Sequence, residues 1–257
     1  GGNKESQFKY SLLGDQDADI VNETAIEKFD SQISEICDRF LIKLTDQPSL
    51  SSLTSRFDEV NPNTFINLPF QIGFASMAKL GTSYVQKDGA SLQVLSQLLT
   101  FKHLHSVIRE SNGAYGGGLN YDGLGGTLNY YSYRDPNPLK SVESFQKTVQ
   151  VALDQTSGSD ASWNDNDLQE AKLAIFQSID APSHISQQGS AFFLKGITDE
   201  MRQKRREDFL AVSINDLKDV AEKYLANGAS VATIIGNKNE VKDETKLKNW
   251  KIKSLEV

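Results

Sequence analysis

The sequence has few of the residues from which many sites are built. Cys37 is its only cysteine, which excludes an intrachain disulfide and a zinc site made from several cysteines. It has three histidines, and neither the H-E-x-x-H nor the H-x-x-E-H zinc motif occurs. No run of 18 apolar residues is present, so the sequence predicts no membrane span.

The overall composition is that of a folded protein. The chain is 38% hydrophobic and 24% charged, and its 257 residues allow one large domain or two small ones. The formal net charge of -7 argues against nucleic-acid binding as the main function, because a nucleic-acid-binding surface needs clustered positive charge.

The first part of the chain predicts a strand, a helix and a linker. Phe8–Asp15 is a short apolar run that ends in Gly-Asp, which is typical of a strand and a turn. A helix with a capping-box spacing is expected to begin at Thr24. Residues 47–63 are polar and contain prolines and serines, which favours a linker. We therefore divide the chain into residues 1–63 and residues 64–257.

The second part predicts alternating strands and helices. Phe65–Ala78 predicts a strand that is interrupted near Pro69 and Gly73. Asp88 is a candidate cap for a long helix that continues to Ile108. The later elements are a hairpin of residues 114–123 and 126–135, helices along 142–153 and 168–179, an apolar patch at 190–197, a helix capped by Ser213, and a strand at 230–237. This order predicts an α+β fold, with helices packed on one face of an antiparallel-rich sheet.

The stretch HLHSVIRESNGAYGGG, residues 103–118, concentrates the polar chemistry of the chain. His103 and His105 diverge by about 200° on a helix, and His184 is in another segment, so we predict no metal site in this chain. The glycines at 116–118 precede a strand and lack a following Lys-Ser/Thr pair, which argues against a phosphate-binding loop. No G-x-S-x-G motif marks a nucleophile.

Arg109 and Tyr115 remain as candidates. Arg109 ends a long helix and Tyr115 begins the next strand, so both are expected at the rim of one helix-to-strand connection. Both side chains can donate hydrogen bonds to a carbonyl oxygen that becomes an oxyanion. Taken alone, the two residues favour a structural interpretation, in which Arg109 complements the helix dipole and Tyr115 is half-buried packing.

Several longer motifs favour a functional interpretation of Arg109 and Tyr115 instead. The segments LLTFKHLHSVIRESNGAYGGG, LNYYSYRDPN, AKLAIFQSIDAP, DEMRQKRREDFLAVS and ATIIGN occur in this order. From about Phe65 to Asn237 the chain resembles the C-terminal region of the presequence proteases, a branch of the pitrilysin (inverzincin) metallopeptidase family. Within that branch, the fungal mitochondrial members are the expected relatives.

The resemblance implies an architecture and a role. Family members have four homologous α+β domains in two halves that close around a chamber. Residues 1–63 would be the tail of the preceding domain, and residues 64–257 the fourth domain. The resemblance assigns Arg109 and Tyr115 to catalysis, as groups that bind the substrate near the scissile bond. It also implies that Gly116 and Gly117 lie beside the bound peptide.

The remaining implications concern the whole enzyme. Its zinc ion would be bound by the N-terminal half of the same polypeptide, and the isolated chain would be inactive. Its substrates would be presequences and other unstructured peptides, and its location the mitochondrial matrix. Neither nucleic acid nor a membrane span is expected. Two alternatives stay open: a non-catalytic structural subunit of the same family, and a free-standing peptide-binding module.

Overall fold

The computed structural model describes residues 28, 31, 32, 35, 63–157, 163–182, 184, 187, 189–227, 229–241 and 243–254. The predicted strand at residues 8–15, Cys37 and nearly all of the predicted linker lie outside this set. The chain divides into two compact units, residues 1–59 with 182–202 and residues 60–181 with 203–257. The division near residue 63 stays a prediction.

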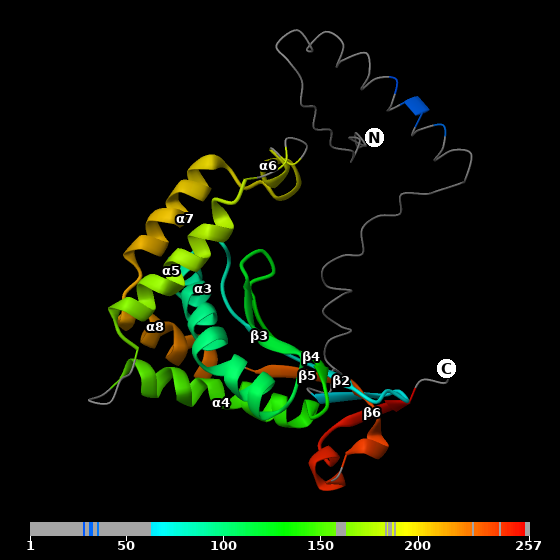
Figure 1. Ribbon diagram of the computed structural model, residues 1–257. Helices are drawn as coiled ribbons and strands as arrows, with labels where there is room; N and C mark the ends of the chain where they lie inside the picture. Colours follow the sequence, from blue (N-terminus) through cyan, green and yellow to red (C-terminus); the bar gives the residue numbers. More distant parts are fainter. Residues whose placement is uncertain are drawn as a thin grey trace. The chain divides into compact units, whose positions relative to one another are not determined.

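The second unit is built on a six-stranded sheet with the order β3-β4-β2-β5-β1-β6 (Figure 1). Strand β5 pairs with β2 in antiparallel fashion, as do β2 with β4 and β3 with β4. β1 pairs in parallel with β5 and with β6. The prediction of an antiparallel-rich sheet is confirmed. The strands are β1 (Asn63–Asn67), β2 (Gly73–Leu80), β3 (Gly116–Asp122), β4 (Thr127–Asp135), β5 (Ser230–Gly236) and β6 (Lys251–Ser254).

Helices cover one face of this sheet, as predicted (Figure 1). The long predicted helix is continuous, but its second half is wound as a π-helix, labelled η2. The helices are α3 (Lys87–Leu99), η2 (Thr100–Ser111), α4 (Pro138–Thr156), α5 (Asp165–Ile179), α6 (Ser190–Lys195), α7 (Asp199–Ala211), α8 (Ile214–Val220) and η4 (Ala221–Ala226), followed by the short 3₁₀ turns η5 (Lys238–Glu240) and η6 (Glu244–Leu247).

The predicted interruption near Pro69 and Gly73 is confirmed, but it separates two strands rather than bending one. Residues 68–72 lie outside any strand, and β5 lies between β1 and β2 in the sheet. A Cβ at Gly73 would lie 2.9 Å from the backbone oxygen of Ile235 on β5. A side chain at that position would therefore push the two strands apart.

The β3–β4 hairpin forms as predicted. Side chains alternate between its two faces, and this alternation decides which of them are exposed to solvent. Tyr130 is fully buried, and its hydroxyl is 2.8 Å from the hydroxyl of Thr148 on α4. Burial raises the pKa of Tyr130 to about 12. Its neighbour Tyr131 points to the other face and is 46% exposed. The second unit thus has one face under helices and an opposite face with exposed aromatic side chains, over which the described residues of this unit place no helix.

Three helix caps are predicted: Ser213 is confirmed, Asp88 is wrong, and Thr24 lies outside the described residues. Ser213 caps α8, and its side chain accepts the backbone N–H of Asp216 at 3.3 Å. Asp88 does not cap α3, because the helix begins after Gln86. The Asp88 carboxylate instead accepts hydrogen bonds from Lys223 at 2.7 Å and Tyr224 at 2.9 Å on η4. It ties the first turn of α3 to another helix.

The sequence patterns do not reveal helix α7. Its buried face carries Arg205, which is 3% exposed and whose guanidinium carbon lies 4.7, 5.1 and 5.6 Å from the ring centres of Phe209, Tyr84 and Tyr121. The guanidinium donates to the backbone oxygen of Tyr84 at 3.3 Å and to the side chain of Gln93 at 3.2 Å. Burial lowers its pKa from the ordinary value. On this face of α7, the Arg205 guanidinium over aromatic rings takes the place that an apolar side chain would usually fill.

We expect Arg205→Ala to lower the free energy of unfolding by about 2–4 kcal/mol, because it leaves a cavity and unpaired acceptors. Chemical denaturation of the protein measures this loss. The matched control is Arg206→Ala, since Arg206 pairs at the surface with Asp180 and should contribute less than about 1 kcal/mol. Equal losses in the two variants would contradict the role assigned to Arg205.

The Asp88 contacts predict a pH dependence of stability. The hydrogen bond from Lys223 lowers the pKa of Asp88 in the folded state. A carboxyl with a lowered folded pKa stabilises the fold above its unfolded pKa of about 3.9, and this contribution disappears as the pH falls below that value. Asp88→Asn should cost about 0.5 kcal/mol at neutral pH, allowing for solvent screening, and nothing in acid.

Denaturation midpoints of the wild type and Asp88→Asn between pH 7 and pH 2.5 test this. The control is Asp199→Asn, because the Asp199 side chain is 93% exposed and should leave the pH profile unchanged. Parallel profiles for wild type and Asp88→Asn would show that the carboxylate contributes nothing.

Candidate functional site

The connection between η2 and β3 is short and closed by backbone hydrogen bonds. Gly113, with φ at 80°, donates its N–H to the backbone oxygen of Arg109 at 3.2 Å. The N–H of Ala114 donates to the backbone oxygen of Ile108 at 3.0 Å. These bonds fold the chain back over the last turn of the helix. As predicted, Arg109 and Tyr115 lie at the two ends of one tight connection.

Arg109 is on the solvent side of η2. Its side chain is exposed, and it makes no ion pair with any residue that the structure describes. It lies within the last turn of a π-helix, a rare conformation that is frequent at functional sites. A guanidinium in this setting keeps its hydrogen-bond donors available for a ligand.

Tyr115 combines an exposed side chain with a fixed backbone. It is 70% exposed, while its N–H donates to the backbone oxygens of Tyr133 at 3.1 Å and Arg134 at 3.3 Å on β4. Its ring meets the ring of Tyr133 edge-on, with centres 5.9 Å apart, and Tyr133 packs on Phe74 of β2 at 5.6 Å. A row of three rings therefore holds the phenol beside β4 and β2.

The three glycines have different surroundings. A Cβ at Gly116 would meet nothing within 4 Å. A Cβ at Gly117 would lie 2.6 Å from a methyl carbon of Ile108, and one at Gly118 would lie 2.9 Å from a methyl carbon of Thr100. The close backbone approach at Gly117 and Gly118 is thus explained by η2 itself. Open space for a ligand is found at Gly116.

A side chain of η2 also binds the backbone of β3. The Thr100 hydroxyl donates to the backbone oxygen of Leu119 at 3.1 Å and accepts its N–H at 2.9 Å. β3 is at one end of the strand order, where backbone groups lack a neighbouring strand. Thr100 satisfies the two groups of Leu119, and it locks the helix to the strand.

The two histidines of η2 do not meet. The His105 ring contacts the Phe101 ring edge-on, with centres 4.8 Å apart. His103 lines a cavity together with Trp163, and burial lowers the pKa of His103. Among the residues that the structure describes, no cluster of three or more His, Cys, Asp or Glu side chains could hold a metal ion. In that same part of the chain, no helix is both long and apolar enough to cross a bilayer.

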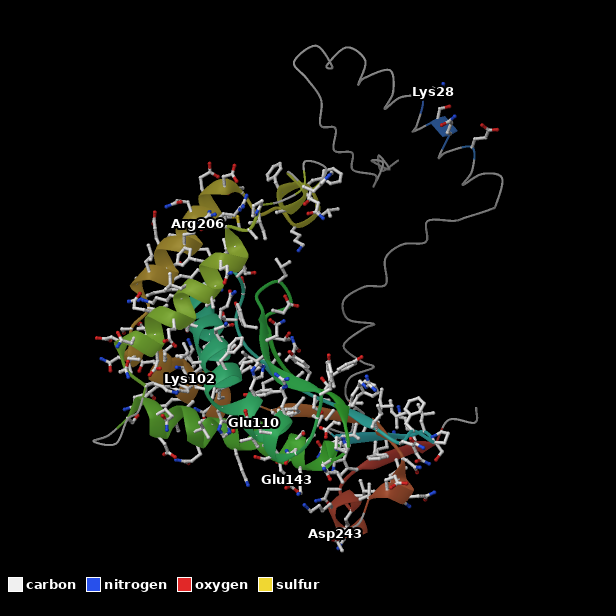
Figure 2. The ribbon with its side chains drawn as sticks, in the orientation of Figure 1. Lys28, Lys102, Glu110, Glu143, Arg206 and Asp243 are labelled. Atoms are coloured by element: carbon white, nitrogen blue, oxygen red, sulfur yellow. The ribbon has the colours of Figure 1, made fainter. Side chains whose placement is uncertain are left out.

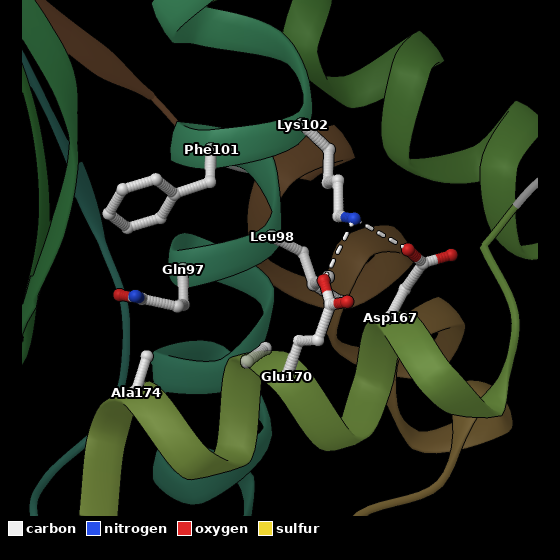
Figure 3. A pocket seen from close by; sticks show the side chains of 8 residues that line it. Gln97, Leu98, Phe101, Lys102, Asp167, Glu170 and Ala174 are labelled. Atoms are coloured by element: carbon white, nitrogen blue, oxygen red, sulfur yellow. Dashed lines mark hydrogen bonds and ion pairs between the residues drawn. The ribbon is translucent and has the colours of Figure 1, made fainter. Parts of the chain in front are cut away.

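Within the part of the chain that the structure describes, cavities open beside η2, and neither Arg109 nor Tyr115 lines the three best formed of them. The cavity of Figure 3, about 310 Å³, lies between α5 and the junction of α3 with η2. There Lys102 bridges Asp167 at 2.7 Å and Glu170 at 3.1 Å. Figure 2 labels Lys102 near the start of η2 and Glu110 near its end. The Lys102 contacts link η2 to α5 at the surface.

Comparison with known proteins establishes the family. Residues 63–237 match the family model described as PreP C-terminal domain, so the chain belongs to this family. The chain is 56% identical, over 97% of its length, to the protein named "Presequence protease, mitochondrial" of Debaryomyces hansenii. It is 50% identical, over 98% of its length, to the protein of the same name from Candida albicans. The resemblance inferred from the motifs is confirmed.

These relatives are much longer than this chain, which spans 24% of each. A crystal structure of a protease from Helicobacter pylori has the same fold with a TM-score of 0.52 and 14% identity, over 68% of this chain and 44% of that chain. The predicted α+β fold is therefore confirmed.

The glycines offer a matched pair of variants. We expect Gly117→Ala to lower the free energy of unfolding by about 1–3 kcal/mol, because the new methyl group overlaps Ile108. Gly116→Ala should change it by less than about 0.5 kcal/mol, because the position is open. Thermal or chemical denaturation of both variants measures the difference. If both lost the same stability, the contact with η2 could not be the reason for Gly117.

Proposed function

We propose that this chain is the C-terminal part of a zinc metalloendopeptidase that degrades presequences and other unstructured peptides in a closed chamber. The observation that carries the proposal is the exposed pair of Arg109 and Tyr115, held by one tight connection in a chain that belongs to the PreP C-terminal domain family. The names of the relatives support the substrate class.

In this proposal Arg109 and Tyr115 bind the peptide at the scissile bond. The guanidinium and the phenol are both hydrogen-bond donors, and donors aimed at a developing oxyanion stabilise it more than they stabilise the substrate. The ring row behind Tyr115 limits the motion of the phenol, so little ordering is left for the transition state. Gly116, where a Cβ would meet nothing within 4 Å, lets the peptide backbone approach the start of β3. Gly117 is buried against Ile108 of η2 and supports this approach from beneath.

The remaining parts belong to the whole polypeptide. We assign the zinc ion to the N-terminal half, as the resemblance to the metallopeptidase family implies. Residues 1–63 would then be the tail of the preceding domain and residues 64–257 the fourth domain. The N-terminal half is the first partner of this chain. The mitochondrial matrix is its location in this proposal, supported by the mitochondrial names of the relatives.

Removal of one hydroxyl tests the proposal. In the full-length protein, Tyr115→Phe should lower kcat for an unstructured basic peptide by about 10²- to 10³-fold, as loss of an oxyanion donor does elsewhere. The melting temperature should stay unchanged, because the hydroxyl is exposed and the phenyl ring still packs on Tyr133. Steady-state cleavage of a fluorogenic peptide and a thermal melt provide the two measurements.

The matched control is Tyr131→Phe, which removes an exposed hydroxyl from the same face of the sheet and should cleave at the wild-type rate. Wild-type turnover by Tyr115→Phe would remove Tyr115 from the mechanism. A full-length protein that cleaves no peptide would favour the structural subunit. Tight peptide binding by the isolated chain would favour the binding module.

A further inference from the structure

Arg134 has an unusual backbone conformation. Among the residues that the structure describes, it is the one residue other than glycine with a positive φ, at 50°. The left-handed region is strained for a residue with a Cβ, and glycine, asparagine or aspartate usually occupies it. Glycine would adopt this conformation without strain, so the presence of an arginine at this position needs an explanation.

The strain goes with a β-bulge. From Gly73 to Ala75, β2 advances two residues, whereas its partners on β4, Asp135 and Ser132, are three residues apart. The extra residue in β4 breaks the alternation of its side chains. Tyr133 and Arg134 are consecutive and both exposed, and Asp135 is fully buried. A bulge of this kind re-aims a side chain, and the αL position in it is ordinarily glycine.

The re-aimed side chain meets Tyr115. The guanidinium carbon of Arg134 lies 5.8 Å from the centre of the Tyr115 ring, within the range of a cation–π contact. The ring of Tyr133 contacts the same phenol edge-on. Both residues also offer their backbone oxygens to the N–H of Tyr115. Consecutive residues of one bulge thus hold Tyr115 by its backbone and by its ring.

The residues that follow the bulge are also hydrogen-bonded to the end of η2, the helix that carries Arg109. Asp135 accepts the N–H of Asn137 at 2.7 Å, and the Asn137 side chain donates to the backbone oxygen of Asn112 at 3.0 Å. Asn112 follows the last residue of η2, three residues after Arg109. The bulge that orients Tyr115 is therefore fixed against the end of the helix that carries Arg109.

From this geometry we infer that Arg134 is a positioning residue for Tyr115. Its guanidinium restrains the exposed phenol ring in one orientation, and the strained backbone is what brings the guanidinium there. The inference rests on the proposed function, in which the Tyr115 hydroxyl contacts the substrate. It assigns Arg134 no contact with the substrate.

The test uses Arg134→Gly in the full-length protein. Glycine adopts the positive φ without strain, so the melting temperature should stay the same or rise. The ring of Tyr115 loses its restraint, and kcat for the fluorogenic peptide should fall about 10-fold with little change in KM, because orientation matters most in the transition state. Arg134→Asn also tolerates this backbone and should give the same result. Arg134→Lys keeps a cation and should recover part of the loss.

A double-mutant cycle shows whether Arg134 acts through Tyr115. In a Tyr115→Ala background, Arg134→Gly should have no further effect on kcat. Wild-type kcat for Arg134→Gly beside an impaired Tyr115→Phe would overturn the inference and leave the proposed function standing. An additive loss in the cycle, or a loss explained by a lower melting temperature, would also overturn it. Wild-type turnover by Tyr115→Phe would overturn both.

Discussion

The close contact between η2 and β3 is the constraint on which the candidate site depends. Ile108 occupies the space that a side chain at Gly117 would need, and the Thr100 hydroxyl binds both backbone groups of Leu119. Because side chains interdigitate this closely, the helix cannot slide along the strand without breaking packing and hydrogen bonds. The relative position of Arg109 on the helix and Tyr115, directly before the strand, follows from this contact.

The features that the sequence predicts are those that depend on local periodicity or on a local hydrogen bond. Alternation in the second hairpin strand separates Tyr130 from Tyr131, because a half-buried strand needs one apolar face. Ser213 caps its helix, since its partner, the N–H of Asp216, is three residues away. The placement of Arg109 and Tyr115 at one connection is predictable for the same reason.

The features that the sequence misses depend on partners far along the chain. α7 escapes detection because its buried face is formed by Arg205 over aromatic rings rather than by apolar residues at helical spacing. Asp88 has the residue type of a cap, but its partners Lys223 and Tyr224 are more than 130 residues away. No local pattern shows that β5 separates β1 from β2.

Arg134 is another feature that the sequence misses, and the fold alone does not require an arginine at this position. In the sequence it is one charged residue of the segment YRDPN, and regular alternation would direct it to the buried face with Ser132. The bulge against β2 turns it outward instead. Glycine would make that bulge with less strain, so the backbone geometry does not account for an arginine. The contact that an arginine adds there is with the ring of Tyr115. A strained backbone that serves only to bring one side chain to another is expected where the second side chain must be held in place.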